Sequence, residues 1–207
     1  MKNLVKDALV LTCITVIAGF ALGFVYEITK APIAKAQLAE LQEAYETVFP
    51  DAASFEVVDS FDSTTATALV QDEGYEDDSI DNCFEAVDAS GNLLGYVMTI
   101  TTTAGYGGDI TFSIGITTDG IINGYSITDI SETAGLGMKS KDTGAGTFSS
   151  QFENRQAEIF TVTKTGASSS SEVDAISGAT ITSKAVTNGI NAGVTYFNSL
   201  VGGASNE

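Results

Sequence analysis

Residues 110–130 read Ile-Thr-Phe-Ser-Ile-Gly-Ile-Thr-Thr-Asp-Gly-Ile-Ile-Asn-Gly-Tyr-Ser-Ile-Thr-Asp-Ile. Aliphatic and β-branched residues recur along two runs, Ile110–Thr117 and Ile121–Ile130, which is typical of strands. Thr118-Asp-Gly120 lies between the runs and supplies the residues of a tight turn. The stretch therefore predicts a β-hairpin.

A second hairpin is predicted directly before the first. Cys83–Ala89 and Asn92–Thr103 are again rich in alternating and β-branched residues, and they are separated by a short turn at Ala89-Ser-Gly91. Two successive hairpins predict an antiparallel sheet. From Phe55 to Thr67 the alternation is weak, and a strand there is only one option.

Helical spacing dominates the C-terminal part of the chain. The run from Thr182 to Leu200 predicts a helix with Thr182 or Ser183 as its N-cap, and its apolar positions are Val186, Ile190, Val194 and Phe197. Thr147–Arg155 predicts a second helix, because Phe148 and Phe152 lie one helical turn apart. Strands followed by helices indicate an α+β fold.

The N-terminus carries an uncharged, mostly apolar run from Ala8 to Tyr26. As a helix it would measure about 28 Å, close to the thickness of a bilayer core. It predicts a transmembrane helix over residues 8–29. A secretory signal peptide is the alternative, since basic residues precede the run and Ala34-Lys-Ala36 imitates a cleavage site, but the run is longer than a usual signal-peptide core.

The remaining chain is long enough for one domain with its own core. Ile33–Phe49 has helical spacing and is expected to continue the anchor, with Pro32 near its first turn. We expect a short N-terminus over residues 1–7, a juxtamembrane helix over 30–50, one domain over 51–201 and a flexible tail over 202–207.

Composition excludes several functions. A formal charge of −18 and the absence of histidine argue against binding to nucleic acid or, by charge, to an anionic membrane surface. Cys13 and Cys83 alone cannot form a disulfide framework or hold an iron–sulfur cluster. No metal site is expected, because the acidic stretch Asp72–Asp78 lacks the spacing of a calcium loop and reads as a solvated loop.

Residues 174–183 read Asp-Ala-Ile-Ser-Gly-Ala-Thr-Ile-Thr-Ser and precede the predicted C-terminal helix. Free amides and the positive end of the helix dipole favour an anionic phosphoryl group at such a turn. The alternative is an ordinary serine and threonine turn before a capped helix.

The pattern Asp-x-x-Ser/Thr-Gly-Ala-Thr resembles the acceptor motif of FMN-binding domains. In that family a flavin transferase joins FMN by a phosphoester to the final threonine, which here is Thr180. Two further stretches resemble the family in the same order, Ala104-Gly-Tyr-Gly-Gly-Asp109 and Ser131-Glu-Thr-Ala-Gly-Leu-Gly-Met138. The resemblance extends from about Cys83 to Phe197, and the chain departs from the usual family stretch by having Ala134 where proline is common.

With its N-terminal anchor, the chain resembles the RnfG family, the G subunits of Rnf ion-translocating oxidoreductase complexes. This resemblance implies an electron-carrying subunit with covalent FMN, in a membrane complex that couples ferredoxin:NAD oxidoreduction to translocation of sodium ions or protons. It also implies a cytoplasmic N-terminus, a single membrane pass, an extracytoplasmic domain, neighbouring Rnf subunits and a flavin transferase during maturation. The chain has no nucleophile placed with a base, so no catalysis by the chain alone is expected.

The resemblance also implies which residues meet the cofactor. Around the phosphate on Thr180 we expect Asp174, Ser177, Gly178, Ala179 and Thr182. Around the flavin ring we expect one segment comprising Glu132, Thr133, Gly135, Leu136, Gly137 and Met138, with Tyr106 and Gly107 as another wall.

Three other functions stay open from the sequence. The chain could be a membrane-anchored flavoprotein that acts alone, or it could be similar to the NqrC component of the sodium-pumping NADH:quinone oxidoreductase. It could also be an adhesion or sensing domain that merely contains the Ser-Gly-Ala-Thr turn, in which case it would carry no flavin.

Overall fold

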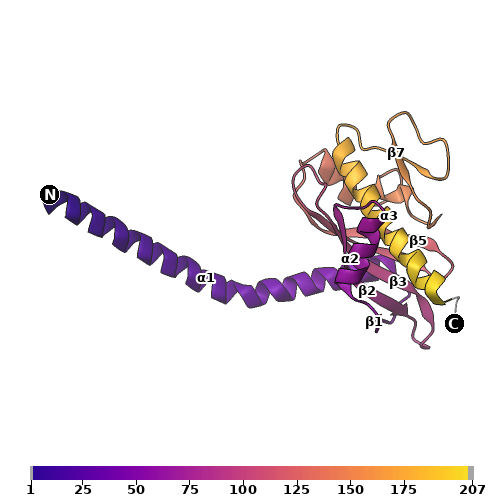
Figure 1. The fold of residues 1–207 in the computed structure, drawn as a ribbon, viewed down its shortest axis with the longest axis horizontal. Coiled ribbons are helices and arrows are strands. Elements are labelled where there is room, and N and C mark those ends of the chain that lie inside the picture. Colours follow the sequence, from indigo (N-terminus) through magenta and orange to yellow (C-terminus); the bar gives the residue numbers. More distant parts are fainter. Residues whose placement is uncertain (1, 205–207) are drawn as a thin grey trace. The chain divides into compact units, whose positions relative to one another are not determined.

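The structure, a computed structural model, describes residues 2–204, apart from the side chains of residues 2–5, 34, 203 and 204. The chain forms two compact units that divide after Glu40. Figure 1 shows the elements in chain order: α1 (Lys2–Val48), β1 (Ser54–Val57), α2 (Ser63–Asp72), β2 (Asp78–Val87), β3 (Leu93–Thr102), β4 (Ile110–Thr117), β5 (Ile121–Ile130), η1 (Gly137–Lys141), η2 (Ser149–Gln151), β6 (Arg155–Gln156), β7 (Thr161–Thr163), β8 (Glu172–Asp174) and α3 (Thr180–Ala204).

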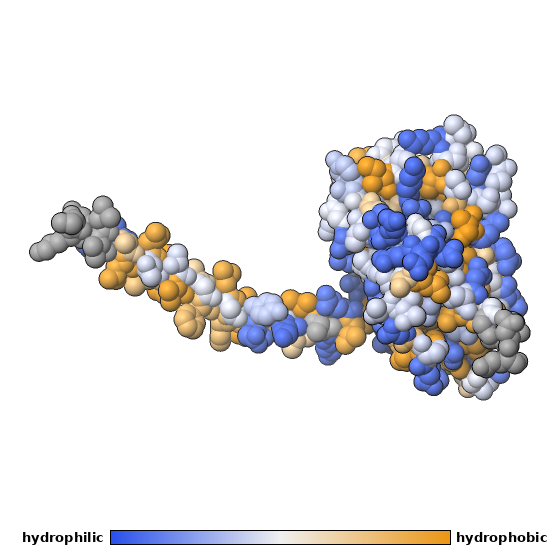
Figure 2. Space-filling model, in the orientation of Figure 1, coloured by the Kyte–Doolittle hydropathy of each residue, from blue (hydrophilic) through white to orange (hydrophobic). Residues whose placement is uncertain are grey.

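The first unit is the N-terminal part of α1, which by length and composition can cross a membrane. Apolar side chains are exposed along much of its length (Figure 2). Its polar side chains bond within the helix: the hydroxyls of Thr12 and Thr29 donate to the carbonyls of Ala8 and Val25, each over 2.9 Å. Hydroxyls satisfied in this way can be accommodated in a lipid environment.

α1 is continuous through the segment where the sequence predicts that a juxtamembrane helix continues the anchor. Pro32 lies inside this one helix. Proline removes one backbone hydrogen bond from a helix interior, and α1 continues past it to Val48.

The second unit begins at Leu41, earlier than residue 51, because the end of α1 packs on the sheet. Val48 and Phe49 are buried there. Gly95 and Gly115 make the approach possible: a Cβ on Gly115 would lie 2.9 Å from Val48 Cβ, and one on Gly95 would lie 2.8 Å from Phe49 Cζ. Side chains at these two positions would push the helix end away from the sheet.

The antiparallel sheet has the order β1-β2-β3-β4-β5-β6. Both predicted hairpins are present, and β4 and β5 have the bounds read from the sequence. Ile110 pairs with Ile130 in the hairpin of β4 and β5. The predicted α+β class, with an antiparallel sheet and flanking helices, is confirmed.

α2 and α3 cover one face of this sheet and form the main core with it (Figure 1). α3 comes close because it presents glycines: a Cβ on Gly189 would lie 2.7 Å from Phe112 Cζ, and one on Gly193 would lie 2.7 Å from Ile100 Cδ1. Asn191 of α3 bonds both backbone groups of Phe160, over 2.8 and 2.9 Å, and so holds the segment before β7 against the helix.

One local prediction was wrong, and one weakly patterned region is now defined. Thr147–Arg155 is not a helix, because only Ser149–Gln151 forms a 3₁₀ turn and Asn154, with φ of 57°, turns the chain into β6. The Phe148 and Phe152 rings still contact each other, with centroids 5.4 Å apart. Their spacing in the sequence therefore predicted a true contact, although the residues between them form a 3₁₀ turn instead of a longer helix. The weakly patterned region before β2 contains β1 and also α2, whose N-cap Asp62 accepts from the Thr65 amide over 2.8 Å.

The bounds of α3 also differ from the prediction. The helix begins at Thr180, so neither Thr182 nor Ser183 is its N-cap. The Ser183 hydroxyl instead donates to the carbonyl of Ala179 and accepts the amide of Ile176, each over 2.9 Å. At the other end α3 includes residues 202–204, which were expected in a tail, and residues 205–207 lie outside the described part.

The acidic stretch before β2 is not wholly a solvated loop. Asp78 opens β2 with 2% of its surface exposed, and its Oδ1 has no hydrogen-bond partner among the described residues. Burial raises the pKa of the Asp78 carboxyl to about 6. A hydrogen bond from Thr102 only partly offsets this desolvation.

The buried Asp78 carboxyl should make the stability of the domain depend on pH. A carboxyl whose pKa is higher in the folded than in the unfolded state makes the free energy of unfolding fall as pH rises through the window between the two values. Here that window runs from the usual value of 3.8 to about 6. Asp78→Asn should remove this decline and stabilise the domain at pH 7 by up to about 3 kcal/mol.

Denaturant unfolding at pH 4 and pH 7 measures this effect. Asp81→Asn is the matched control, because Asp81 also lies in β2 and already has two hydroxyl partners. An Asp78→Asn variant that unfolds more easily than wild type at pH 7 would contradict the prediction.

Candidate functional site

A cavity of about 590 Å³ lies where three sequence segments meet. Its lining comes from the loop after β3, the loop after β5 and the start of α3, and comprises Tyr106, Glu132, Thr133, Leu136, Gly137, Gly178, Ala179, Thr180, Ile181 and Thr182. These are the segments that the sequence singled out separately. The fold brings nine of the predicted site residues together at one cavity.

The turn before α3 presents Thr180 at this cavity. The Ala179 amide donates to the Ile176 carbonyl over 2.9 Å, and Gly178 takes a φ of 77°, a left-handed conformation that suits glycine. The helical hydrogen bonds of α3 start with the amide of Ser183, which donates to the Ala179 carbonyl four residues earlier. The amides of the first helical residues, from Thr180 to Thr182, have no acceptor within the helix and are available to an anion.

Thr182 adds a polar group inside the cavity. Its side chain is 1% exposed and lies in the lining. Among the hydrogen bonds of the described residues, none involves the Thr182 hydroxyl. The Thr182 hydroxyl is therefore available to a bound ligand.

Gly137 holds the loop after β5 against the start of α3. A Cβ at this position would lie 2.5 Å from Glu132 Oε2 and 2.7 Å from Thr182 Oγ1. In the same way, a Cβ on Gly178 would lie 3.1 Å from a methyl group of Leu136. A side chain on Gly137 would force Glu132 or Thr182 to move, and one on Gly178 would press on the Leu136 side chain, so these glycines help set the shape of the cavity.

Glu132 ties the remaining loop to this arrangement. Its side chain is buried, and its Oε1 accepts the amides of Tyr106 over 2.7 Å and Gly107 over 3.2 Å. Two backbone donors satisfy that carboxylate oxygen, so Glu132 acts as a clamp between the loop after β3 and the loop after β5. Gly107 contributes its amide to this clamp and does not line the cavity.

Large apolar side chains surround the cavity. Tyr106 is 71% exposed, Ile181 53% and Leu136 41%, and each comes from a different segment. Exposed apolar surface gathered around a cavity is typical of a ligand site. The sequence reading missed Ile181, although an apolar residue between Thr180 and Thr182 at a helix start was a usable signal.

Four more predicted residues lie outside the lining: Asp174, Ser177, Gly135 and Met138. Asp174 has a different set of contacts: its carboxylate accepts the Ala167 amide over 2.9 Å, and its backbone exchanges two hydrogen bonds with the Gln151 side chain. Asp174 borders a separate hollow of about 300 Å³ on the side of Gln151 and Lys139. Its contacts hold the loop that leads into the turn before α3.

Comparison with known proteins supports a ligand site at this cavity. The FMN-binding domain family matches residues 105–195, which contain all three cavity segments. The G subunit of the Na(+)-translocating ferredoxin:NAD(+) oxidoreductase complex of Acetobacterium woodii is 32% identical over 203 residues, covering 96% of this chain and 94% of that protein. The chain belongs to the RnfG family of ion-translocating oxidoreductase complexes.

Other members of the RnfG family show similar agreement. The G subunit of the ion-translocating oxidoreductase complex of Methanosarcina acetivorans is 31% identical over 202 residues, covering 97% of this chain and 98% of that one. The G subunit of the proton-translocating ferredoxin:NAD(+) oxidoreductase complex of Clostridium ljungdahlii is 31% identical over 196 residues, covering 94% and 91%. The crystal structure of Shewanella oneidensis NqrC matches at 25% identity and a TM-score of 0.47, covering 59% of this chain and 61% of that chain.

Substitutions at two glycines of this RnfG protein test the cavity. Gly137→Ala should weaken binding of free FMN at least about tenfold, because the new methyl group displaces Glu132 and Thr182. FMN fluorescence during titration with the purified chain measures the affinity.

Gly135→Ala is the control in the same loop. Nothing lies within 4 Å of the added carbon, but the φ of 76° at Gly135 makes the substitution cost roughly 1–2 kcal/mol of stability. The control should therefore lose stability and keep its affinity. Equal loss of affinity in both variants would mean that the shape of the cavity is not what binds FMN.

Proposed function

We propose that this protein carries FMN covalently on Thr180 and passes electrons within an ion-translocating ferredoxin:NAD(+) oxidoreductase complex. One observation carries the proposal: Thr180 is the first residue of α3 and lines the cavity. The Thr180 hydroxyl therefore lies both at the end of a helix that can bind an anion and beside a cavity large enough for a ligand.

The residues present fit a phosphate on Thr180. The amides of Ile181 and Thr182 are not bonded within the helix, and the Thr182 hydroxyl is available beside them. Lys184 is exposed one helical turn after Thr180 on the same side of α3, so it adds positive charge in a strongly acidic chain. Together these groups can neutralise a phosphodiester.

The rest of the cavity fits a flat, mostly apolar ring. Its volume of about 590 Å³ lies in the usual range for cofactor sites. Tyr106, Leu136 and Ile181 offer apolar surface around the ring, and Thr133 offers a hydrogen bond at its edge. When bound, a flavin would supply the electron-transfer chemistry for which these side chains only provide the binding surface.

Attachment needs a second protein. The Thr180 hydroxyl would replace AMP on the FMN phosphorus of FAD: an O–P bond to threonine forms, the pyrophosphate bond breaks, AMP leaves and the hydroxyl gives up its proton. Among the described lining residues the only carboxylate is that of Glu132, and its Oε1 is committed to two amides. We therefore assign activation of the hydroxyl to a flavin transferase, which acts on this chain as a substrate.

We place the protein in the cell membrane with a single pass. The apolar length of α1 and the membrane complexes of the relatives support this placement. Residues 1–7 would be cytoplasmic, the FMN domain extracytoplasmic, and the partners the other subunits of the complex. A shallow hollow on α1 beside Gly19 and Gly23 would let a neighbouring helix pack closely.

Substitution of the acceptor tests the proposal directly. Full-length chain co-expressed with a flavin transferase should gain the mass of FMN and fluoresce in a denaturing gel, and Thr180→Ala should lose both signals completely. Thr182→Ala should keep the covalent flavin at reduced yield, because it loses a phosphate contact and not the acceptor. Covalent flavin on Thr180→Ala would refute the assignment, and wild type without flavin would refute the function.

Labelling in cells tests the orientation. In a chain carrying Cys13→Ser and Cys83→Ala, we introduce Ser168→Cys in the exposed loop before β8. A maleimide that cannot cross membranes should label this cysteine in intact spheroplasts, whereas Lys6→Cys should react only after permeabilisation. The reverse labelling pattern would place the domain in the cytoplasm.

A further inference from the structure

Asp78 is a buried carboxylate that the proposed function does not use. It lies where the turn after α2 enters β2, and its Oδ1 lacks a partner among the described residues. An ionised carboxylate with a bare oxygen in a protein core is costly, so this residue lowers the stability of the domain at neutral pH. A residue that destabilises the core in this way is a candidate for a functional role.

Two routes join Asp78 to the cavity. Through the sheet, the Thr102 side chain bonds the Asp78 carboxyl and also accepts the Ala104 amide over 3.5 Å. Ala104 begins the loop that carries Tyr106 into the cavity wall. Through α3, Oδ1 of Asp78 lies 3.4 Å from the position of a Cβ on Gly189, and about 10 Å of helix separates Gly189 from Thr182.

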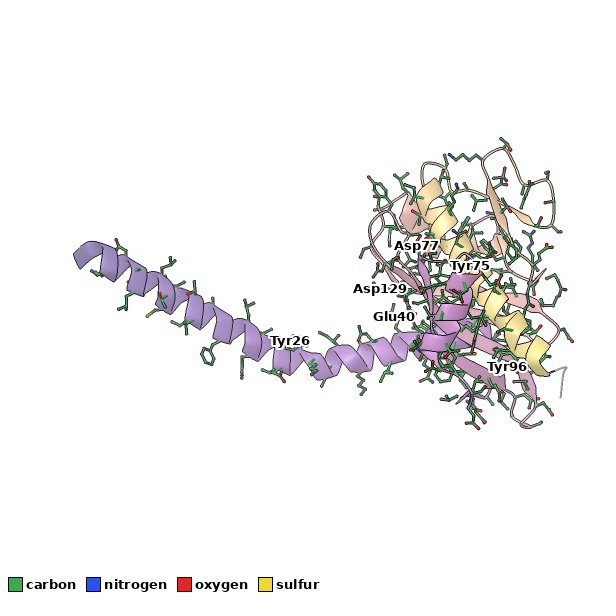
Figure 3. The ribbon with its side chains drawn as sticks, viewed as in Figure 1. Tyr26, Glu40, Tyr75, Asp77, Tyr96 and Asp129 are labelled. Atoms are coloured by element: carbon green, nitrogen blue, oxygen red, sulfur yellow. The ribbon has the colours of Figure 1, made fainter. Side chains whose placement is uncertain are left out.

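The described groups that face Asp78 supply no positive charge. β3, β4 and α3 present Thr102, Phe112 and Gly189. The titratable groups that interact with Asp78 are Asp77, whose charge further raises the pKa of Asp78, and Tyr75, whose pKa is raised mainly by burial and further by the Asp78 charge. Figure 3 marks Tyr75 and Asp77 at the turn leading into β2. Thr102 is the one group named here that favours the ionised form of Asp78, through a single hydrogen bond, and no positive charge among these groups opposes the effect of a new negative charge nearby.

We propose that Asp78 is a proton-binding site linked to the redox state of the flavin cavity, so that its carboxylate takes up a proton when an electron enters the cavity. This inference rests on the proposed function. One electron arrives from a low-potential one-electron donor and one proton arrives from solvent. The proton converts the Asp78 carboxylate to the carboxylic acid. On oxidation the electron leaves the cavity and the proton returns to solvent.

The scale of the linkage follows from Coulomb's law. At an effective dielectric constant of about 20, a unit negative charge roughly 10 Å from a carboxyl raises its pKa by about one. The oxidised domain starts with the pKa of Asp78 at about 6. Uptake of the proton is therefore largest between about pH 6 and pH 7, where the oxidised form is mostly ionised and the reduced form is mostly protonated.

Infrared difference spectroscopy on the flavin-loaded full-length chain tests the proposal. Electrochemical reduction at pH 6.5 should produce the carbonyl stretch of a newly protonated carboxylic acid, and this band should shift in heavy water. Asp78→Asn should lack the band, while Asp81→Asn should keep it because Asp81 bonds Ser79 and Thr101. In parallel, the midpoint potential of wild type should show extra pH dependence between pH 6 and pH 7 that Asp78→Asn loses.

Each outcome decides a specific point. Wild type without the carboxylic acid band, or a band that persists in Asp78→Asn, overturns the linkage and leaves the covalent flavin intact. A full-length chain that takes up no flavin overturns the proposed function, and the linkage falls with it. The wild-type spectrum alone is sufficient to refute the linkage, even if the variants fold poorly.

Discussion

The close packing of α3 on the sheet is the constraint on which the other features depend. Gly189 and Gly193 let the helix backbone approach Phe112 and Ile100 to a distance that a Cβ would prevent. This contact fixes the axis of α3 and hence the position of its first residue, Thr180. Because Thr180 lies at the end of a helix held by the core, its hydroxyl and the neighbouring amides keep one geometry.

The cavity then depends on how two loops are held against that helix end. Glu132 accepts hydrogen bonds from two amides of the loop after β3. Gly137, which has no side chain, lets its backbone lie close to both Glu132 and Thr182. One buried carboxylate and one glycine therefore join all three segments. This explains why the Glu-Thr-Ala-Gly-Leu-Gly stretch matters: its first two and last two residues line the cavity, and Glu132 and Gly137 also hold the neighbouring segments in contact.

The sequence predicted the elements whose pattern is governed by burial on one face. β4 and β5 alternate around a glycine turn, and α3 keeps helical spacing, so both were found. It failed where local contacts override the pattern: the pair Phe148 and Phe152 fits a 3₁₀ turn as well as a helix. It also missed the burial of Asp78, because an acidic run resembles a solvated loop and only the pairing of β2 with β3 shows otherwise.

The central claim is that Thr180 itself bears the flavin, and site-resolved mass spectrometry tests it most directly. Proteolysis of the loaded full-length chain releases a peptide that contains both Thr180 and Thr182, and electron-based fragmentation retains the phosphodiester while cleaving the backbone. The account predicts that the added mass of FMN begins with fragments that include Thr180. Fragments that place the mass on Thr182 or Ser177, or a peptide with no added mass, would contradict it.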